Sequence, residues 1–363
     1  MLSSEFIFFS SFTLFILAVL LLDLGVFSRK NHIISFKEAA AWSAVWVALS
    51  VAFYFVIKYH GDLIHGVNTY EEVERITELY SPGEVELVPG DFEESVKRYK
   101  ENMAIEYITG YLLEYTLSAD NIFVMIMIFA AFGVREVYYK KVLFWGILGA
   151  LVMRFIFIFV GSALVVEFHW LLWIFGAFLV YSGIKIFFEK DAEEKIEPQK
   201  HPVVRLASRF FAVYPRYVRD HFFIRRKDKL MMTPLFLVVL IIEFTDLIFA
   251  VDSVPAVFSV TKDPYVVFFS NIFAIMGLRS MFFFLSNIMH LFHYLKLGLG
   301  FLLTFIGFKM IFNEWLQEVG FKSVYSIYII LGILTISIVS SLLFPVKPPQ
   351  AVALSDQPEK VIE

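Results

Sequence analysis

The chain of 363 residues has the composition of a membrane protein, because it is 59% hydrophobic and only 18% charged, with a mean hydropathy of +0.71. Soluble domains carry about 45–50% apolar and about 25% charged residues. The formal net charge of −4 excludes the broad basic field of a nucleic-acid-binding protein. The absence of cysteine excludes disulfides, thiolate metal sites and cysteine nucleophiles.

Nine apolar runs are long enough to cross a bilayer as helices, which takes about 20 mostly apolar residues. They lie at about 6–28, 40–59, 104–132, 141–164, 168–188, 232–258, 265–287, 292–313 and 323–345. The runs are continuous, unlike the short alternating segments of a membrane β-barrel. The first run begins with Glu5 rather than with basic residues, so we expect a retained span and not a signal peptide. The sequence therefore predicts an all-α polytopic membrane protein with about nine transmembrane helices.

The charges of the loops predict the orientation of these helices. The loop at 60–103 is acidic and the loop at 189–230 is basic. Short loops rich in lysine and arginine stay in the cytoplasm. We therefore expect the N-terminus outside, the C-terminus inside and the acidic loop on the extracytoplasmic side. The acidic loop is expected to be a solvated surface, and the basic loop an amphipathic segment on an anionic leaflet.

Spans three to five and spans six to eight look like two copies of one three-helix unit. Matching residues occur in the same order in both copies: Glu114 with Asp246, Asp120 with Asp252, Arg154 with Arg279, Gly176 with Gly300, Gly183 with Gly307, and Lys185 with Lys309. Since three is odd, the second copy enters the membrane from the opposite side. Inverted repeats are typical of secondary transporters, whose substrate sites lie near the midplane. The alternative, chance similarity between phenylalanine-rich helices, does not explain the matched order.

These patterns divide the chain into seven predicted units. They are an N-terminal hairpin at 1–59, the acidic loop at 60–103, repeat 1 at 104–188, the basic loop at 189–230, repeat 2 at 231–313, a last helix at 314–345 and a disordered tail at 346–363.

Acids inside the spans are the candidate functional residues, because a charge at the bilayer centre costs about 2.5–3.5 kcal/mol. The candidate metal ligands are Glu114, Asp120, Asn121, Asp246 and Asp252, and the weaker path or support residues are Asp23, Glu243, Ser253, Arg154 and Arg279. A break in each helix would turn both of its acids inward, and Pro255 predicts such a break beside Asp252. Oxygen ligands alone suit hard divalent cations, and the residues leave Mn²⁺, Mg²⁺ and Ca²⁺ open.

The buried arginines support an alternative in which Arg154 and Arg279 neutralise the acids and only fix helix packing, as in a non-transporting scaffold. The acids outnumber the arginines, which favours the cation site. Lys185 and Lys309 are expected to snorkel to an interface, and the glycines seven residues apart to form a packing face. The chain has no phosphate loop, nucleophile elbow or HExxH zinc motif, so we do not expect an enzyme.

Two segments resemble the signature motifs of the TerC/Alx family: LSADNIFV at 117–124 and EFTDLIFAVDSVPA at 243–256. The resemblance covers essentially the whole chain except the acidic loop and the tail. It implies a multi-pass inner (plasma) membrane protein that exports manganese, in a family named for tellurium resistance, with acids at Glu114, Asp120, Asp246 and Asp252. We predict alternating access with proton exchange as the candidate coupling and Mn²⁺ as substrate, with Ca²⁺ or Mg²⁺ as alternatives. We expect no permanently bound cofactor, the lipid bilayer as partner and no nucleic-acid partner. A tellurite-stress complex partner and a Ca²⁺ exchanger remain alternatives.

Overall fold

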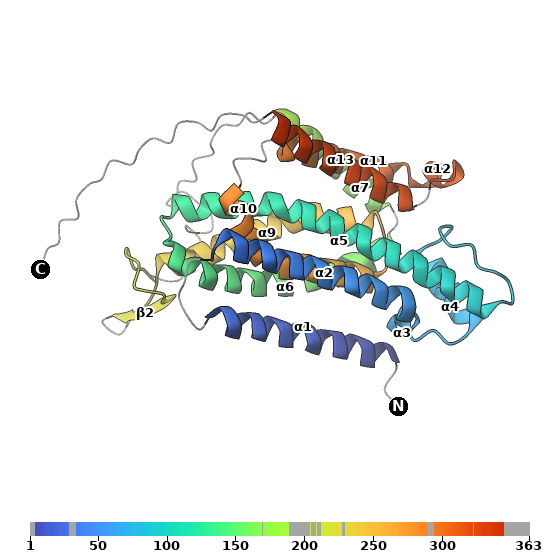
Figure 1. Ribbon diagram of the computed structural model, residues 1–363, viewed down its shortest axis with the longest axis horizontal. Coiled ribbons are helices and arrows are strands. Elements are labelled where there is room, and N and C mark those ends of the chain that lie inside the picture. Colours follow the sequence, from blue (N-terminus) through green and yellow to red (C-terminus); the bar gives the residue numbers. More distant parts are fainter. Residues whose placement is uncertain are drawn as a thin grey trace, which may run out of the picture.

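The computed structural model of the chain describes residues 4–28, 34–168, 170–188, 204, 208, 212–226, 229–288, 294–321 and 323–344. Its long helices run roughly along one axis of an elongated molecule (Figure 1). The short helices α3 and α4 lie at one end of this bundle, and the strands lie at the other. The predicted tail at 346–363 and much of the basic loop lie outside the described residues.

The helices follow the predicted spans closely. They are α1 (Ser4–Ser28), α2 (Phe36–His60), α3 (Asp62–His65), α4 (Tyr70–Tyr80), α5 (Phe92–Ala131), α6 (Glu136–Glu167), α7 (Leu171–Phe188), α9 (Pro234–Phe258), α10 (Pro264–Ile288), α11 (Leu295–Ile311), α12 (Asn313–Glu318) and α13 (Ser323–Leu343).

The fold differs from the all-α prediction in one place, because part of the basic loop forms a small sheet. Its strands are β1 (Ala212–Val213), β2 (Phe223–Arg226) and β3 (Lys229–Met232), in the order β1-β3-β2. β2 and β3 pair antiparallel, and β1 joins β3 in parallel. The sequence pattern missed this sheet because its strands are too short to show a period of two.

Five helices in the described residues are long and apolar enough to cross a membrane: α2, α9, and the segments Glu136–Leu164, Pro264–Ser286 and Tyr325–Leu343 of α6, α10 and α13. Three shorter apolar helical segments lie in α1, α7 and α11. The fold is thus that of a mostly helical protein with several membrane spans. The count of nine, the orientation and the repeats stay predictions.

Helices α7 and α11 pack closely because glycines line both sides of their contact. A Cβ atom added to Gly307 would lie 2.6 Å from the carbonyl oxygen of Gly176, and one added to Gly183 would lie 2.6 Å from that of Gly300. Only glycine leaves room for this approach of two backbones. The predicted packing face of glycines is confirmed: Gly176 faces Gly307, and Gly183 faces Gly300.

We expected the acidic loop to be only a solvated surface, but in the structure it is folded against the bundle. The side chains of His65 in α3 and Asp263, at the beginning of α10, are joined at 2.7 Å, and both are buried. The Ser81 hydroxyl donates to Glu106 Oε1 of α5 at 2.9 Å. Thr69 and Glu72 form a capping box at the beginning of α4. These contacts attach the loop to the ends of two long helices.

Candidate intramembrane ion site

Arg154 of α6 is the centre of a buried polar cluster to which four helices contribute. Its side chain is 1% exposed and pairs with Glu114 of α5. Arg154 Nη2 also lies 3.4 Å from Asp246 Oδ1 of α9, and Nη1 donates to Asn271 Oδ1 of α10 at 2.9 Å. One guanidinium therefore connects α6 with both acid-bearing helices, α5 and α9.

The two carboxylates of this cluster are buried, yet each keeps an oxygen with no hydrogen-bond partner in the described part of the chain. These atoms are Glu114 Oε2 and Asp246 Oδ2. Further along α5 and α9, Asn121 Nδ2 and Ser253 Oγ are also buried without a partner. Buried polar atoms are nearly always bonded to protein or to ordered water, so each exception needs an explanation. The cluster therefore has unused capacity to bind a ligand.

Helical spacing explains why these groups lie together. Glu114, Ser118 and Asn121 are four and three residues apart, which places them on one face of α5. The Ser118 hydroxyl donates to Glu114 Oε1 at 3.4 Å. On α9, Glu243 and Asp246 are three residues apart and share a face in the same way.

The helix breaks expected beside the acids are absent, because α5 and α9 are both continuous in the structure. Pro255 lies inside the last turn of α9, which ends at Phe258. Pro255 has no N–H to donate to the preceding turn, yet the helix continues to Phe258, and the carbonyl of Pro255 accepts from Ser259 N at 3.0 Å.

The support residues extend the cluster along α9 and α10. Glu243 is half-buried, and its carboxylate lies against Gly149 of α6, in the space that a side chain at that position would fill. Arg279 is 5% exposed and lines a narrow cleft together with Asp246 and the apolar side chains of Met125 and Ile242. Arg154 and Arg279 thus both lie near Asp246.

For several predicted site residues the structure describes the backbone but not the side chain. The backbones of Asp23, Asp120 and Asp252 lie in α1, α5 and α9, but their side chains lie outside the described residues. Within the part that is described, no three His, Asp or Glu side chains gather closely enough to hold a metal ion. The structure thus brings together Glu114, Asp246 and Arg154, while the full predicted ligand set stays a prediction.

Two polar residues of the interior were not foreseen. Asn271 binds Arg154, and its Nδ2 donates to Val267 O at 3.0 Å. The feature of the sequence that could have pointed to Asn271 is an asparagine inside an apolar run. Lys309 was expected to snorkel, which is wrong: it is buried and donates to Ser259 O at 3.0 Å. Carbonyls at the end of a helix lack helical partners, so the end of α9 offers this ammonium an acceptor.

Apolar helices surrounding a buried charge cluster define a multi-pass integral membrane protein. The chain belongs to the integral membrane protein TerC family, whose profile matches residues 99–347. The resemblance drawn from the two motifs is therefore confirmed.

The chain is similar over most of its length to known members. It is 40% identical over 334 residues to "Uncharacterized membrane protein STKORF319" of Myxococcus xanthus, covering 92% of this chain and 91% of that protein. It is 37% identical over 329 residues to "Putative membrane-bound redox modulator Alx" of Salmonella typhi, covering 90% and 91%. The protein of the same name in Escherichia coli K12 is 36% identical over 310 residues, covering 84% and 85%. No solved structure matches the chain.

Proposed function

We propose that this chain is a secondary transporter that exports divalent cations, manganese foremost, across the inner (plasma) membrane by alternating access. One observation carries the proposal. Glu114 and Asp246, on the first helices of the two predicted repeats, are buried and each keeps an unpartnered carboxylate oxygen. Intramembrane acids are costly, and in transporters they mark ion pathways.

The chemistry of the cluster suits a hard cation that binds reversibly. Arg154 pairs with both Glu114 and Asp246, and Arg279 lines the cleft beside Asp246, so a bound cation would compete with these side chains for the carboxylates. Carboxylate oxygens, with the Ser253 hydroxyl and the Asn121 amide oxygen as neutral donors, are ligands for Mn²⁺, Mg²⁺ or Ca²⁺. A proton that binds either carboxylate competes with the cation for the same oxygen. Proton exchange is therefore the coupling that we propose.

Two further observations support alternating access between inverted repeats. The reciprocal contacts of Gly176 with Gly307 and of Gly183 with Gly300 are those expected when α7 and α11 are related by a two-fold axis. In the predicted orientation α9 leads outward from the cytoplasm, so Glu243 lies one turn closer to the cytoplasm than Asp246. Glu243 would receive the cation before the central pair does.

A non-transporting scaffold is the second candidate, and the pairing of Arg154 with both acids favours it. A packing role requires only that the charges neutralise one another. The name of the Alx relatives offers a third, redox role, but this chain has no cysteine, so such a role would not involve thiols.

Cellular manganese content distinguishes these candidates. We would express Asp246→Asn and Glu114→Gln in a strain that lacks its own manganese exporters, with Glu94→Gln as the matched control. Glu94 is a partly exposed acid on the first turn of α5 that pairs with Lys97 and Arg98, far along the helix from Glu114. We expect Glu94→Gln to lower cellular manganese as wild type does, and the two site variants to fail although they reach the membrane in equal amounts. If the site variants protect the cells as well as wild type, the proposal is wrong.

A further inference from the structure

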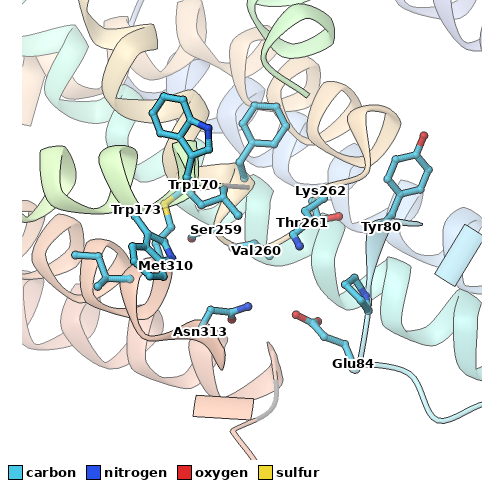
Figure 2. Close-up of a pocket in the computed structure, with 14 residues that line it drawn as sticks. Tyr80, Glu84, Trp170, Trp173, Ser259, Val260, Thr261, Lys262, Met310 and Asn313 are labelled. Carbon is cyan, nitrogen blue, oxygen red and sulfur yellow. The ribbon is translucent and has the colours of Figure 1, made fainter. Parts of the chain in front are cut away.

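A cavity of about 450 Å³ lies outside the ion site, at the end of the bundle that carries the acidic loop (Figure 2). One wall comes from the acidic loop, through Tyr80 and Glu84. The other walls come from the beginning of α7, the connection between α9 and α10, and the junction of α11 with α12. A cavity of this size matches those that hold small ligands.

The lining of the cavity has an aromatic side and a charged side. Figure 2 shows Trp170 and Trp173 on one side, and Tyr80 and Glu84 on the other. Lys262 lines the cavity as well, so the wall carries one acid and one base. One base and one acid lie behind the wall: Lys309 donates to the carbonyl of the lining residue Ser259, and the Glu106 carboxyl is hydrogen-bonded to the side chain of the lining residue Thr261.

The cavity lies where the membrane boundary is expected, because α7 begins, and α9 and α11 end, around it. The indoles of Trp170 and Trp173 are 58% and 62% exposed. Tryptophan concentrates at membrane–water interfaces, where its ring sits at the level of the lipid headgroups. Exposed apolar side chains then continue away from the cavity, Ile174 along α7 and Phe308 along α11. An amphiphile with its head in the cavity would find an apolar surface for its chains.

The charges select among amphiphiles. A divalent cation lacks a set of acids here, since no three acidic or histidine side chains gather within the described residues. A purely anionic headgroup would face the Glu84 carboxylate. A headgroup with a phosphate and a primary ammonium complements both signs, because the phosphate fits a lysine and the ammonium donates to a carboxylate.

We propose that this cavity binds the headgroup of a zwitterionic phospholipid of the phosphatidylethanolamine type, with its phosphate toward Lys262 and its ammonium toward Glu84. The indoles cover the glycerol region, and the acyl chains lie along α7 and α11. The acidic loop thereby acquires a role, as one wall of a lipid site. This site does not depend on the proposed cation transport.

Native mass spectrometry of the delipidated full-length protein tests the proposal. Phosphatidylethanolamine and phosphatidylglycerol would be titrated in parallel. We expect phosphatidylethanolamine to bind about tenfold more tightly, and Glu84→Gln to remove most of this preference, the effect of one charge-assisted hydrogen bond. Lys262→Gln should weaken both lipids, because both carry the phosphate. Glu94→Gln, which changes a partly exposed acid outside the cavity, should leave the binding of both lipids unchanged.

Three results would overturn the proposal. One is equal binding of the two lipids to wild type, and another is an unchanged preference in Glu84→Gln. The third is full displacement of the lipid by an equal concentration of soluble glycerophosphoethanolamine, which would make the ligand a soluble zwitterion. Trp173→Ala is a second test of the site in case the charge variants do not fold. It keeps both charges and should still weaken phosphatidylethanolamine binding.

Discussion

Replacement of Arg154 by glutamine tests the architecture of the buried cluster. The guanidinium is 1% exposed, pairs with Glu114, lies 3.4 Å from Asp246 and donates to Asn271. Arg154→Gln leaves two carboxylates buried side by side without their cation. Removing one partner of a buried pair costs about 3–5 kcal/mol. At about 2 °C per kcal/mol for a large chain, we expect the Tm in detergent to fall by about 6–10 °C.

The assay is thermal unfolding of the purified protein, with Lys141→Gln as the matched control. Lys141 lies on the same helix, and its Nζ is 3.0 Å from Asp220 Oδ2, but both side chains are more than one-third exposed. An exposed pair contributes about 0–1 kcal/mol, so the control should lower the Tm by at most about 2 °C.

A double-mutant cycle completes this test. Asp246→Asn removes one of the two charges that Arg154→Gln leaves unpaired, so the double variant should be more stable than the sum of the single losses predicts. Coupling of about 0.5–3 kcal/mol is usual for groups in contact. A Tm of Arg154→Gln within about 2 °C of wild type, or strictly additive losses, would refute the central place of Arg154.

Two glycine positions give further predictions. Gly307→Val should separate α7 from α11 and lower the Tm by several degrees, because its Cβ would lie 2.6 Å from a backbone oxygen. As the control, Gly332→Val on α13 meets nothing within 4 Å and should leave the Tm unchanged. Equal Tm values for the two variants would contradict this packing. Gly149→Ala places its Cβ where the flexible carboxylate of Glu243 lies, so we expect slower manganese transport at an unchanged Tm, and transport at the wild-type rate would remove Glu243 from the path.

Much of the fold was predictable from the sequence, because apolar runs of membrane length admit few other structures. The runs placed the long helices. The glycines seven residues apart predicted a packing face, which the structure places between α7 and α11. The sheet of the basic loop was missed, since its strands of two to four residues carry no period. The folding of the acidic loop was missed as well. Its attachment depends on pairs far apart in the chain, such as His65 with Asp263, which no local pattern reveals.

The candidate site was predictable in its residue types but not in its pairings. Charges in apolar runs identified Glu114, Asp246 and Arg154, and helical spacing correctly placed Ser118 on the face of Glu114. The break predicted from Pro255 was wrong, because the loss of one helical hydrogen bond does not end α9, which continues to Phe258. Asn271 was not foreseen as a partner of Arg154, since that contact joins helices α6 and α10 across 117 residues of sequence.

Cation flux in liposomes that contain only the purified protein tests the central claim most directly. A manganese-sensitive dye inside the vesicles would record transport, with Ca²⁺ and Mg²⁺ tested in parallel. The account predicts manganese flux for wild type and for Glu94→Gln, and its loss in Asp246→Asn and Glu114→Gln protein that remains folded. The absence of flux in wild type, or flux at the wild-type rate in Asp246→Asn, would contradict it.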